Sequence, residues 1–567
     1  MANTSQRRRR DQTSWIRDLL LLLLLAGVLF GYELGGRALW NPDEGRYAEI
    51  PREMAESGDY VTPRLNYVKY FEKPVLFYWL QAGSIKLFGV NEWSLRLWTA
   101  LFATFGCLAV YVAGRRLYNR RAGWLAAGVL ATTPLYDFLG GAITLDMTVS
   151  VLMTMALLAF LLGVREPPGT NRRWWLYGFY ALCALAVLTK GLIGIVIPGM
   201  VIGAWILLLG EWRLLREIYL PTGLLLFLAI AAPWHVLAAR ANPEFLQFYF
   251  VHEHFQRYLT TVHSRYQPVW YFAVVLLAGM YPWSAFVFQA LKDALPNAWR
   301  ERRKHRETWF LVLWAGLVFV FFSASKSKLI PYILPVLPPL ALLCGRYFAR
   351  AWEQPQRFVQ QRLFWVLLIL GVGLGTALLA APHLMPNHPT VAESRNLLGE
   401  NFYFIALCLI LAGVVPFLYS RFGGARRTII SLLTLSALLL TAVDMGAPAL
   451  DGNHTVKPLA LALKPRLQPG DEVATYHHYY QDLPVYLERR VSVVEWKGEL
   501  EFGMSVEDTS EWMLDETAFA RRLRSKTMYV VTDASEYETL RRQTPVPLYL
   551  LAQYGRQVLL VNREPKS

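Results

Sequence analysis

Residues 19–34 read LLLLLLLAGVLFGYEL, an apolar run that directly follows a basic segment. A basic flank before an apolar run also occurs in secretory signal peptides, which end at a cleavage site of small residues. Here bulky Tyr32, Glu33 and Leu34 stand at that position. We therefore predict a retained first transmembrane helix, with its basic flank in the cytoplasm.

Apolar runs of this kind recur along most of the chain. The 567 residues are 54% hydrophobic and only 17% charged, which argues against a soluble protein. A helix needs about 20 apolar residues to cross a bilayer, and the runs predict a polytopic α-helical membrane protein with about thirteen such helices. We place them near residues 19–34, 93–113, 123–136, 145–164, 175–189, 191–209, 219–237, 269–290, 308–323, 329–343, 363–381, 402–419 and 428–444.

The loops between these helices alternate in charge. Six arginine-rich loops fall on one side, as the positive-inside rule requires of the cytoplasmic side. Much of the net charge of +15 therefore sets topology, and because the arginines are dispersed over short loops, it does not indicate nucleic-acid binding. The loops carry Arg115, Arg116, Arg120 and Arg121; Arg165, Arg172 and Arg173; Arg213 and Arg216; Arg300, Arg302, Arg303, Lys304 and Arg306; Arg346, Arg350, Arg357 and Arg362; and Arg421, Arg426 and Arg427.

An odd number of spans puts the C-terminal segment on the extracytoplasmic side. Its strand-like runs at 472–477, 528–532 and 557–561 alternate with polar helical stretches near 515–525 and 535–543, so we predict a small α/β domain over 448–567. The transmembrane domain would cover 1–447, including a juxtamembrane first extracytoplasmic loop over 35–92. The four cysteines all fall inside apolar runs, which argues against a disulfide framework.

The segment from Ala38 to Leu80 is too polar to cross lipid and too aromatic for a solvated linker. Pro42 and Asp43 look like a helix start, and the residues after them fit an amphipathic helix lying at the membrane surface. The acidic pair Asp43 and Glu44 fits either a functional site or a helix cap favoured by the helix dipole.

Several charged residues lie at predicted membrane edges, where a charged side chain is energetically costly and usually has a function. Asp146 begins the fourth span, and the alternation puts the lysines of this set at the extracytoplasmic edge, where lysine is unusual. Together they could form a cationic site for phosphate; singly, each lysine also fits a snorkelling or capping role. The basic residues concerned are Arg46, Lys73, Lys190, Lys326 and Lys328.

The loop after the seventh span reads His252-Glu253-His254-Phe255-Gln256-Arg257-Tyr258. Two histidines at i and i+2 do not share a helical face, so this is not the metalloprotease pattern. They could be a surface cluster, or one imidazole could join Glu72 or Asp43 around a divalent metal, which both ligand types suit.

Taken in order, these motifs make the chain resemble the C-type membrane glycosyltransferases, and among them most strongly the bacterial lipid A aminoarabinosyltransferases. Two positions depart from the family pattern. Ile330 and Pro331 precede Tyr332 in place of a Pro-Thr-Tyr run, and the first loop has Asp43-Glu44 in place of Asp-x-Asp, which favours a lipid-phosphate donor over a nucleotide sugar. The motifs are Trp40–Ile50, Tyr70–Pro74, Leu145–Met147, Leu188–Gly191, His252–Tyr258 and Ser325–Pro335.

The resemblance implies an inverting enzyme of the bacterial inner membrane, with its site on the periplasmic face. It would transfer 4-amino-4-deoxy-L-arabinose from undecaprenyl phosphate to lipid A phosphates, which lowers surface charge and gives resistance to polymyxin. The partners would then be the lipid-linked sugar, lipid A and membrane lipids, and the protein would act as a monomer. No cofactor is certain, and a divalent metal ion is a possible one.

The site residues follow from the same resemblance. Because a phosphate acceptor is already anionic, Asp43 needs no strong base role and could position the sugar, stabilise the anomeric centre or hold a metal. Glu72 and His252 are the candidate metal ligands. The predicted catalytic residues are Asp43 and Asp146, and the predicted substrate-binding residues are Glu44, Arg46, Tyr47, Tyr70, Lys73, Lys190, His254, Arg257, Tyr258, Lys326, Lys328 and Tyr332.

Three other functions remain open at this stage. A protein O-mannosyltransferase-like enzyme would share the fold and differ in its acceptor. A flippase or transporter of lipid-linked sugar would show inverted repeats and broken or charged helices near mid-membrane. A membrane-anchored binding or sensor protein would work through 448–567 and would not need the first loop.

Overall fold

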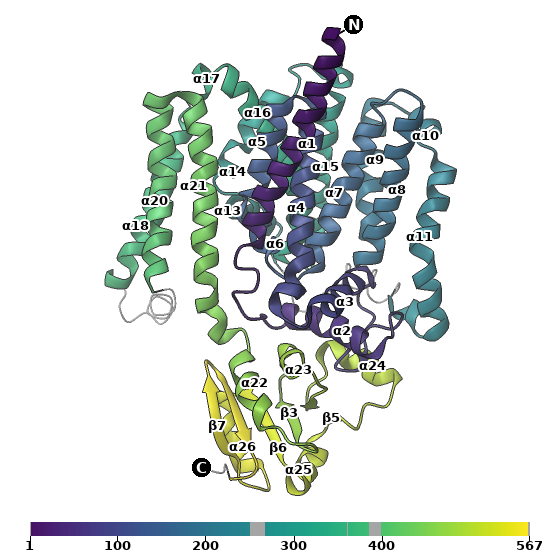
Figure 1. The fold of residues 1–567 in the computed structure, drawn as a ribbon, viewed down its shortest axis with the longest axis vertical. Helices are drawn as coiled ribbons and strands as arrows, with labels where there is room; N and C mark the ends of the chain where they lie inside the picture. The colour runs from purple at the N-terminus through teal and green to yellow at the C-terminus, as the bar shows by residue number, and fades with distance from the viewer. Residues whose placement is uncertain (1, 250–266, 360, 385–398, 565–567) are drawn as a thin grey trace. The chain divides into compact units, whose positions relative to one another are not determined.

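The computed structural model describes residues 2–249, 267–359, 361–384 and 399–564, which fall into two compact units (Figure 1). The first, here the helical unit, comprises Met1–Glu33, Leu97–His235 and Phe250–Gly446. The second, the mixed unit, joins three segments far apart in sequence, Leu34–Arg96, Val236–Tyr249 and Ala447–Ser567.

The helical unit contains the membrane-spanning helices. Among the described residues, eight helical stretches are long and apolar enough to cross a bilayer, or nine if one bent pair counts as a span. The unit's principal helices are α1 (Ala2–Gly31), α4 (Glu92–Leu117), α5 (Arg120–Ala131), α6 (Pro134–Gly140), α7 (Leu145–Gly163), α8 (Thr170–Lys190), α9 (Ile193–Leu209), α11 (Leu220–Ala241), α13 (Tyr271–Gly279), α14 (Ser284–Ala294), α15 (Arg306–Ala324), α16 (Leu337–Glu353), α18 (Leu363–Leu384), α20 (Glu400–Leu418) and α21 (Gly424–Gly446).

The multi-pass architecture is confirmed, but the count of about thirteen spans is not. The predicted span 123–136 is two helices, because the chain breaks at Thr132–Thr133 before Pro134, which opens α6. The predicted span 269–290 is the bent pair α13 and α14, which meet at 100° around a break that contains Pro282. Apolar composition alone does not locate such breaks.

Close helix contacts and exposed apolar side chains both fit a lipid environment. A Cβ on Gly371 of α18 would lie 2.7 Å from the Leu409 carbonyl oxygen and 2.8 Å from the Gly413 Cα of α20, so these helices pack backbone to backbone. Large apolar residues such as Leu25 of α1 and Ile369 of α18 are more than half exposed. Hydrocarbon chains satisfy such surfaces where water would not.

The mixed unit contains a six-stranded sheet in the order β5-β4-β3-β6-β8-β7. The first four strands are parallel, whereas β8 pairs antiparallel to both β6 and β7. Its strands are β3 (Glu472–Tyr476), β4 (Ser492–Val494), β5 (Met513–Leu514), β6 (Met528–Asp533), β7 (Tyr549–Tyr554) and β8 (Gln557–Val561), and its helices are α2 (Asp43–Ser57), α3 (Leu76–Phe88), α22 (Lys457–Leu463), α23 (Asp482–Leu487), α24 (Glu501–Val506), α25 (Glu516–Ser525) and α26 (Ala534–Gln543), with a short hairpin of β1 (Arg64–Leu65) and β2 (Val68–Lys69).

Strands β3, β6 and β8 confirm the three predicted strands, and α25 and α26 confirm the two predicted helices. Asp515 caps α25 by accepting a hydrogen bond from the Ala518 amide at 2.7 Å, and Asp533 caps α26 in the same way. The core of this sheet is aliphatic and includes Val494, Val530 and Leu560. Short, almost continuously buried strands and helix caps account for this part of the fold.

Polar contacts join the three segments of the mixed unit. The Asn66 side chain donates to the Val491 carbonyl at 2.9 Å and accepts from the Val491 amide at 3.1 Å. Lys69 forms an ion pair with Glu244 at 2.7 Å. The first loop is therefore held in place by residues more than 400 positions later in the chain.

Candidate functional site

Helix α2 begins at Asp43 as predicted, but its charged faces are not solvated. Glu49, Arg52 and Glu53 are all buried within the mixed unit. Arg52 donates to both carboxylate oxygens of Glu49, at 2.5 and 2.7 Å. The helix predicted as amphipathic therefore buries these charges in ion pairs, which a periodic pattern cannot distinguish from a hydrated face.

Glu44 occupies the first turn of α2 and holds the loop together. Its carboxylate accepts two hydrogen bonds from Arg96, at 2.9 and 2.8 Å, and two from Arg37, at 2.7 and 3.2 Å. The Trp40 amide supplies a fifth at 3.0 Å. This arrangement saturates the acceptor positions of a carboxylate, so it favours a structural role for Glu44 over the predicted contact with substrate.

Asp43 is the exposed acid of the pair. Its side chain is 57% exposed, and its Oδ1 lies 3.6 Å from Nη2 of the buried Arg46. Arg46 in turn places its Nε 3.1 Å from Oε1 of Glu499, which also accepts a hydrogen bond from Gln481 at 3.0 Å. Burial raises the pKa of Glu499, while Arg46 and Gln481 act to lower it. One arginine thus links the candidate catalytic acid to the C-terminal segment.

Three tyrosines surround this arginine. The Arg46 guanidinium lies 5.6 Å from the ring centroid of Tyr47, whose ring packs 6.4 Å from that of Tyr78. The hydroxyls of Tyr70 and Tyr78 are buried, and neither has a hydrogen-bond partner among the described residues. Burial raises the pKa of both phenols, so they are neutral donors available to a bound polar group.

Glu72 and Lys73 are both largely buried. The Lys73 ammonium donates to the Glu72 carbonyl at 2.8 Å and lies 3.8 Å from its carboxylate. Within the described residues, no group of three or more His, Cys, Asp or Glu side chains is arranged to hold a metal. The other predicted members of this site, His252, His254, Arg257 and Tyr258, lie outside the described residues.

A second group of predicted site residues meets in the helical unit. Asp146 stands at the start of α7 and Lys190 at the end of α8, where the helix dipoles favour an acid and a base respectively. The Lys190 ammonium donates to the Asp146 carboxylate and lies 4.8 Å from the ring centroid of Tyr332. The structure therefore brings these three predicted residues together.

The two lysines of the Ser325–Lys328 motif have different environments. Lys326 is exposed. Lys328 is 4% exposed, and its ammonium donates to the carbonyl oxygens of Ser325 and Gln267, at 2.5 and 2.9 Å. The exposed Lys326 is therefore the better placed of the two to contact an anion, whereas Lys328 stabilises the backbone at Ser325 and Gln267.

No sequence motif indicated the C-terminal residues that hold the start of α2. The Asn41 side-chain amide donates to the Asp482 carboxylate, and the Asp482 amide donates back at 3.0 Å. A Cβ on Gly45 would lie 2.5 Å from the Asp482 nitrogen, so only glycine permits this approach of α2 to α23 (Figure 1). With Glu499, these contacts link residues more than 400 positions apart, for which no local motif exists.

Two family models match separate parts of the chain. The model described as dolichyl-phosphate-mannose-protein mannosyltransferase matches residues 72–236, and the model of the aminoarabinose transferase C-terminal domain matches residues 459–562. The undecaprenyl phosphate-α-4-amino-4-deoxy-L-arabinose arabinosyl transferase 2 of Sodalis glossinidius is 30% identical, over 89% of this chain and 90% of its own length. The chain belongs to this arabinosyl transferase family.

Other members are similar over nearly their full length. The arabinosyl transferase of Erwinia tasmaniensis is 28% identical, over 94% of this chain and 96% of that protein. The crystal structure of ArnT from Cupriavidus metallidurans bound to undecaprenyl phosphate is 30% identical and superposes with a TM-score of 0.83, covering 98% of this chain and all of that one. The arabinosyl transferase family and its multi-pass fold therefore extend over both units.

Proposed function

We propose that this protein transfers 4-amino-4-deoxy-L-arabinose from undecaprenyl phosphate to the phosphate groups of lipid A. The similarity to arabinosyl transferases over nearly the whole chain, including a structure with undecaprenyl phosphate bound, is the observation that carries the proposal. Masking lipid A phosphates lowers the negative charge of the surface, and the protein would thereby confer resistance to polymyxin and other cationic peptides.

The site would act at the periplasmic face of the inner membrane. The alternation of arginine-rich loops supports this orientation, with about thirteen crossings and the segment 448–567 on the same side as the first loop. The protein would function there as a monomer among membrane lipids, which supply both the donor and the acceptor.

In this proposal Asp43 is the residue closest to the chemistry. A phosphate acceptor carries about −1.5 to −2 charge at neutral pH and needs no general base. The exposed Asp43 carboxylate would instead orient the amino sugar and stabilise positive charge at the anomeric carbon as the bond to the leaving phosphate lengthens. Arg46 limits the positions that this carboxylate can adopt, because it pairs with Glu499 on its other side.

Cationic side chains would hold the leaving polyprenyl phosphate. Lys73 is the described candidate in the same unit as Asp43, and a cation at that position neutralises charge that develops in the transition state. Lys190 would act as a pair with Asp146, whose contact already balances its charge. A divalent metal on Glu72 and His252 stays a prediction, and no step of this scheme requires it.

The test is complementation of a polymyxin-sensitive strain that lacks its aminoarabinosyl transferase, followed by mass spectrometry of lipid A. We expect the wild-type protein to add the mass of one aminopentose and Asp43→Asn to abolish the addition at equal protein level. Glu501→Gln is the matched control, because Glu501 is exposed in the same unit.

Unmodified lipid A despite good expression of the wild-type chain would contradict the proposal. The mannosyltransferase model over 72–236 makes a protein O-mannosyltransferase-like activity the second candidate. Transfer of hexose from a polyprenyl phosphate to serine or threonine of a protein would then be the reaction to assay.

A further inference from the structure

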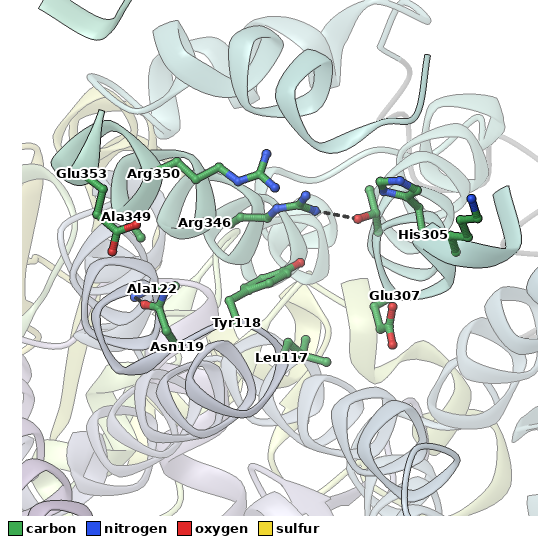
Figure 2. A pocket seen from close by; sticks show the side chains of 12 residues that line it. Leu117, Tyr118, Asn119, Ala122, His305, Glu307, Arg346, Ala349, Arg350 and Glu353 are labelled. Carbon is green, nitrogen blue, oxygen red and sulfur yellow. Dashed lines mark hydrogen bonds between the residues drawn. The ribbon is translucent and has the colours of Figure 1, made fainter. Parts of the chain in front are cut away.

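A pocket with a volume of about 380 Å³ opens at one end of the helical unit, and Figure 2 shows the side chains that line it. Its walls come from the turn between α4 and α5, the start of α15 and the last turns of α16. These are three of the arginine-rich segments that the charge alternation assigns to the cytoplasmic side. The pocket therefore lies where helix ends meet water, at the level of lipid headgroups.

The positive charges of this pocket exceed its own negative charges. Arg346 and Arg350 stand one turn apart on α16, and Figure 2 shows both side chains extending in the same direction. Like charges at this spacing destabilise a helix unless something neutralises them. The exposed Lys304, which lies 3.6 Å from the Glu301 carboxylate, adds a third basic residue to the lining.

The acidic residues of the lining do not neutralise Arg346. Glu307 pairs with Arg165 at 2.8 Å, and Glu353 pairs with Arg121 at 2.8 Å. Arg350 pairs with Asp293, also at 2.8 Å. Within the part of the chain that the structure describes, no carboxylate forms an ion pair with Arg346.

Arg346 is nevertheless held in a fixed position. Its Nη1 donates to the Thr308 hydroxyl at 2.8 Å, and its guanidinium carbon lies 5.2 Å from the ring centroid of Tyr118. Tyr118 also lines the pocket; its buried hydroxyl has the Arg346 guanidinium as a polar neighbour and donates to no acceptor among the described residues. A positioned guanidinium beside an unsatisfied hydroxyl donor is an arrangement that suits the oxygens of a phosphate.

We propose that this pocket binds the phosphate group of an anionic phospholipid from the cytoplasmic leaflet. Basic pockets between transmembrane helices on that side are typical sites for acidic headgroups. The volume fits a headgroup of this kind, since small-molecule pockets run from about 300 to 1,000 Å³. The bound phosphate would join α4, α15 and α16, and would do so independently of the aminoarabinose chemistry.

Native mass spectrometry and thermal unfolding of the purified full-length protein test this assignment. The probes are phosphatidylglycerol, with phosphatidylcholine as the zwitterionic comparison. We expect phosphatidylglycerol to be retained selectively and to raise the unfolding temperature. One basic residue contributes about 1 kcal/mol to such binding, so Arg346→Gln should weaken it about fivefold.

Two further variants separate binding from folding. Tyr118→Phe removes only a hydroxyl and should weaken phosphatidylglycerol binding without lowering stability in phosphatidylcholine. Arg427→Gln removes an exposed arginine from another basic loop and should leave binding unchanged. Equal retention by the wild type, Arg346→Gln and Tyr118→Phe would overturn the proposal.

A third arm distinguishes the two sources of phosphate. Inorganic phosphate is added at about physiological ionic strength, where screening limits weak exposed contacts. We expect it neither to raise the unfolding temperature nor to displace phosphatidylglycerol. Stabilisation by inorganic phosphate that depends on Arg346 and equals that by the lipid would overturn the assignment to a lipid.

Discussion

Replacing Glu499 with glutamine tests whether the C-terminal segment positions the candidate catalytic acid. Oε1 of Glu499 serves both Arg46 and Gln481, and the side chains of Glu499 and Arg46 are 15% and 8% exposed. Removing one partner of a buried ion pair costs about 3–5 kcal/mol. Because glutamine retains one acceptor, we expect Glu499→Gln to cost about 2–3 kcal/mol. If this free energy is lost from transition-state stabilisation because Arg46 and Asp43 are misplaced, kcat should drop about 30- to 150-fold.

The assay measures kcat and KM with purified protein, undecaprenyl-phosphate-linked sugar and lipid A. Glu501→Gln is the control and should match the wild type, whereas Glu499→Asp should recover part of the lost kcat because it restores a carboxylate. Since the pKa of Glu499 is raised, the wild type should lose activity as the pH falls toward that pKa, and Glu499→Gln should lack this dependence. Equal kcat in both glutamine variants, or a loss of thermal stability with unchanged kcat, would refute the positioning role.

Three other outcomes follow from the structure. Gly45→Ala places a Cβ 2.5 Å from a backbone nitrogen and should cost about 1–3 kcal/mol of stability, whereas Gly83→Ala, with nothing within 4 Å, should cost little; equal melting temperatures would contradict this. The losses of activity in Asp146→Asn and Lys190→Met should sum to about 1 kcal/mol more than the loss in the double variant, because each single change already breaks the ion pair. Additive losses would mean that the two residues act independently. Burial raises the pKa of Asp482 to about 6 in the folded protein. The contribution of the protonated Asp482 carboxyl to the free energy of unfolding is therefore fully present below the pKa of the unfolded chain, and it is lost as the pH rises through about 6. The stability deficit of Asp482→Asn, followed by tryptophan fluorescence, should therefore shrink between about pH 4 and about pH 7, and a constant deficit would contradict the shifted pKa.

The sequence predicted those parts of the fold that depend on local pattern. Long apolar runs allow few alternatives to membrane-spanning helices, and short strand-like runs between polar helical stretches located β3, β6 and β8. The breaks that divide α5 from α6 and α13 from α14 escaped prediction, because the residues on either side are equally apolar. A span count taken from hydropathy does not register such breaks.

The candidate site was predictable only as a set of residue types. Asp146 and Lys190 were expected at one membrane edge and do meet, and Tyr332, predicted only as a substrate-binding residue, lies beside them. In contrast, Lys326 and Lys328 belong to one motif but differ in burial, since their surroundings come from distant segments. Charge and spacing alone gave no means of separating a lysine exposed to an anion from one bound to carbonyl groups.

The contacts of α2 with Asp482 and Glu499 also bear on biosynthesis. Asn41 and its partner are 441 positions apart, so the start of α2 leaves the ribosome long before the residues that hold it. A nascent chain, or one truncated before residue 482, carries every transmembrane helix but lacks these contacts. The contacts that hold Asp43 and the start of α2 can therefore form only after Asp482 and Glu499 have been synthesised.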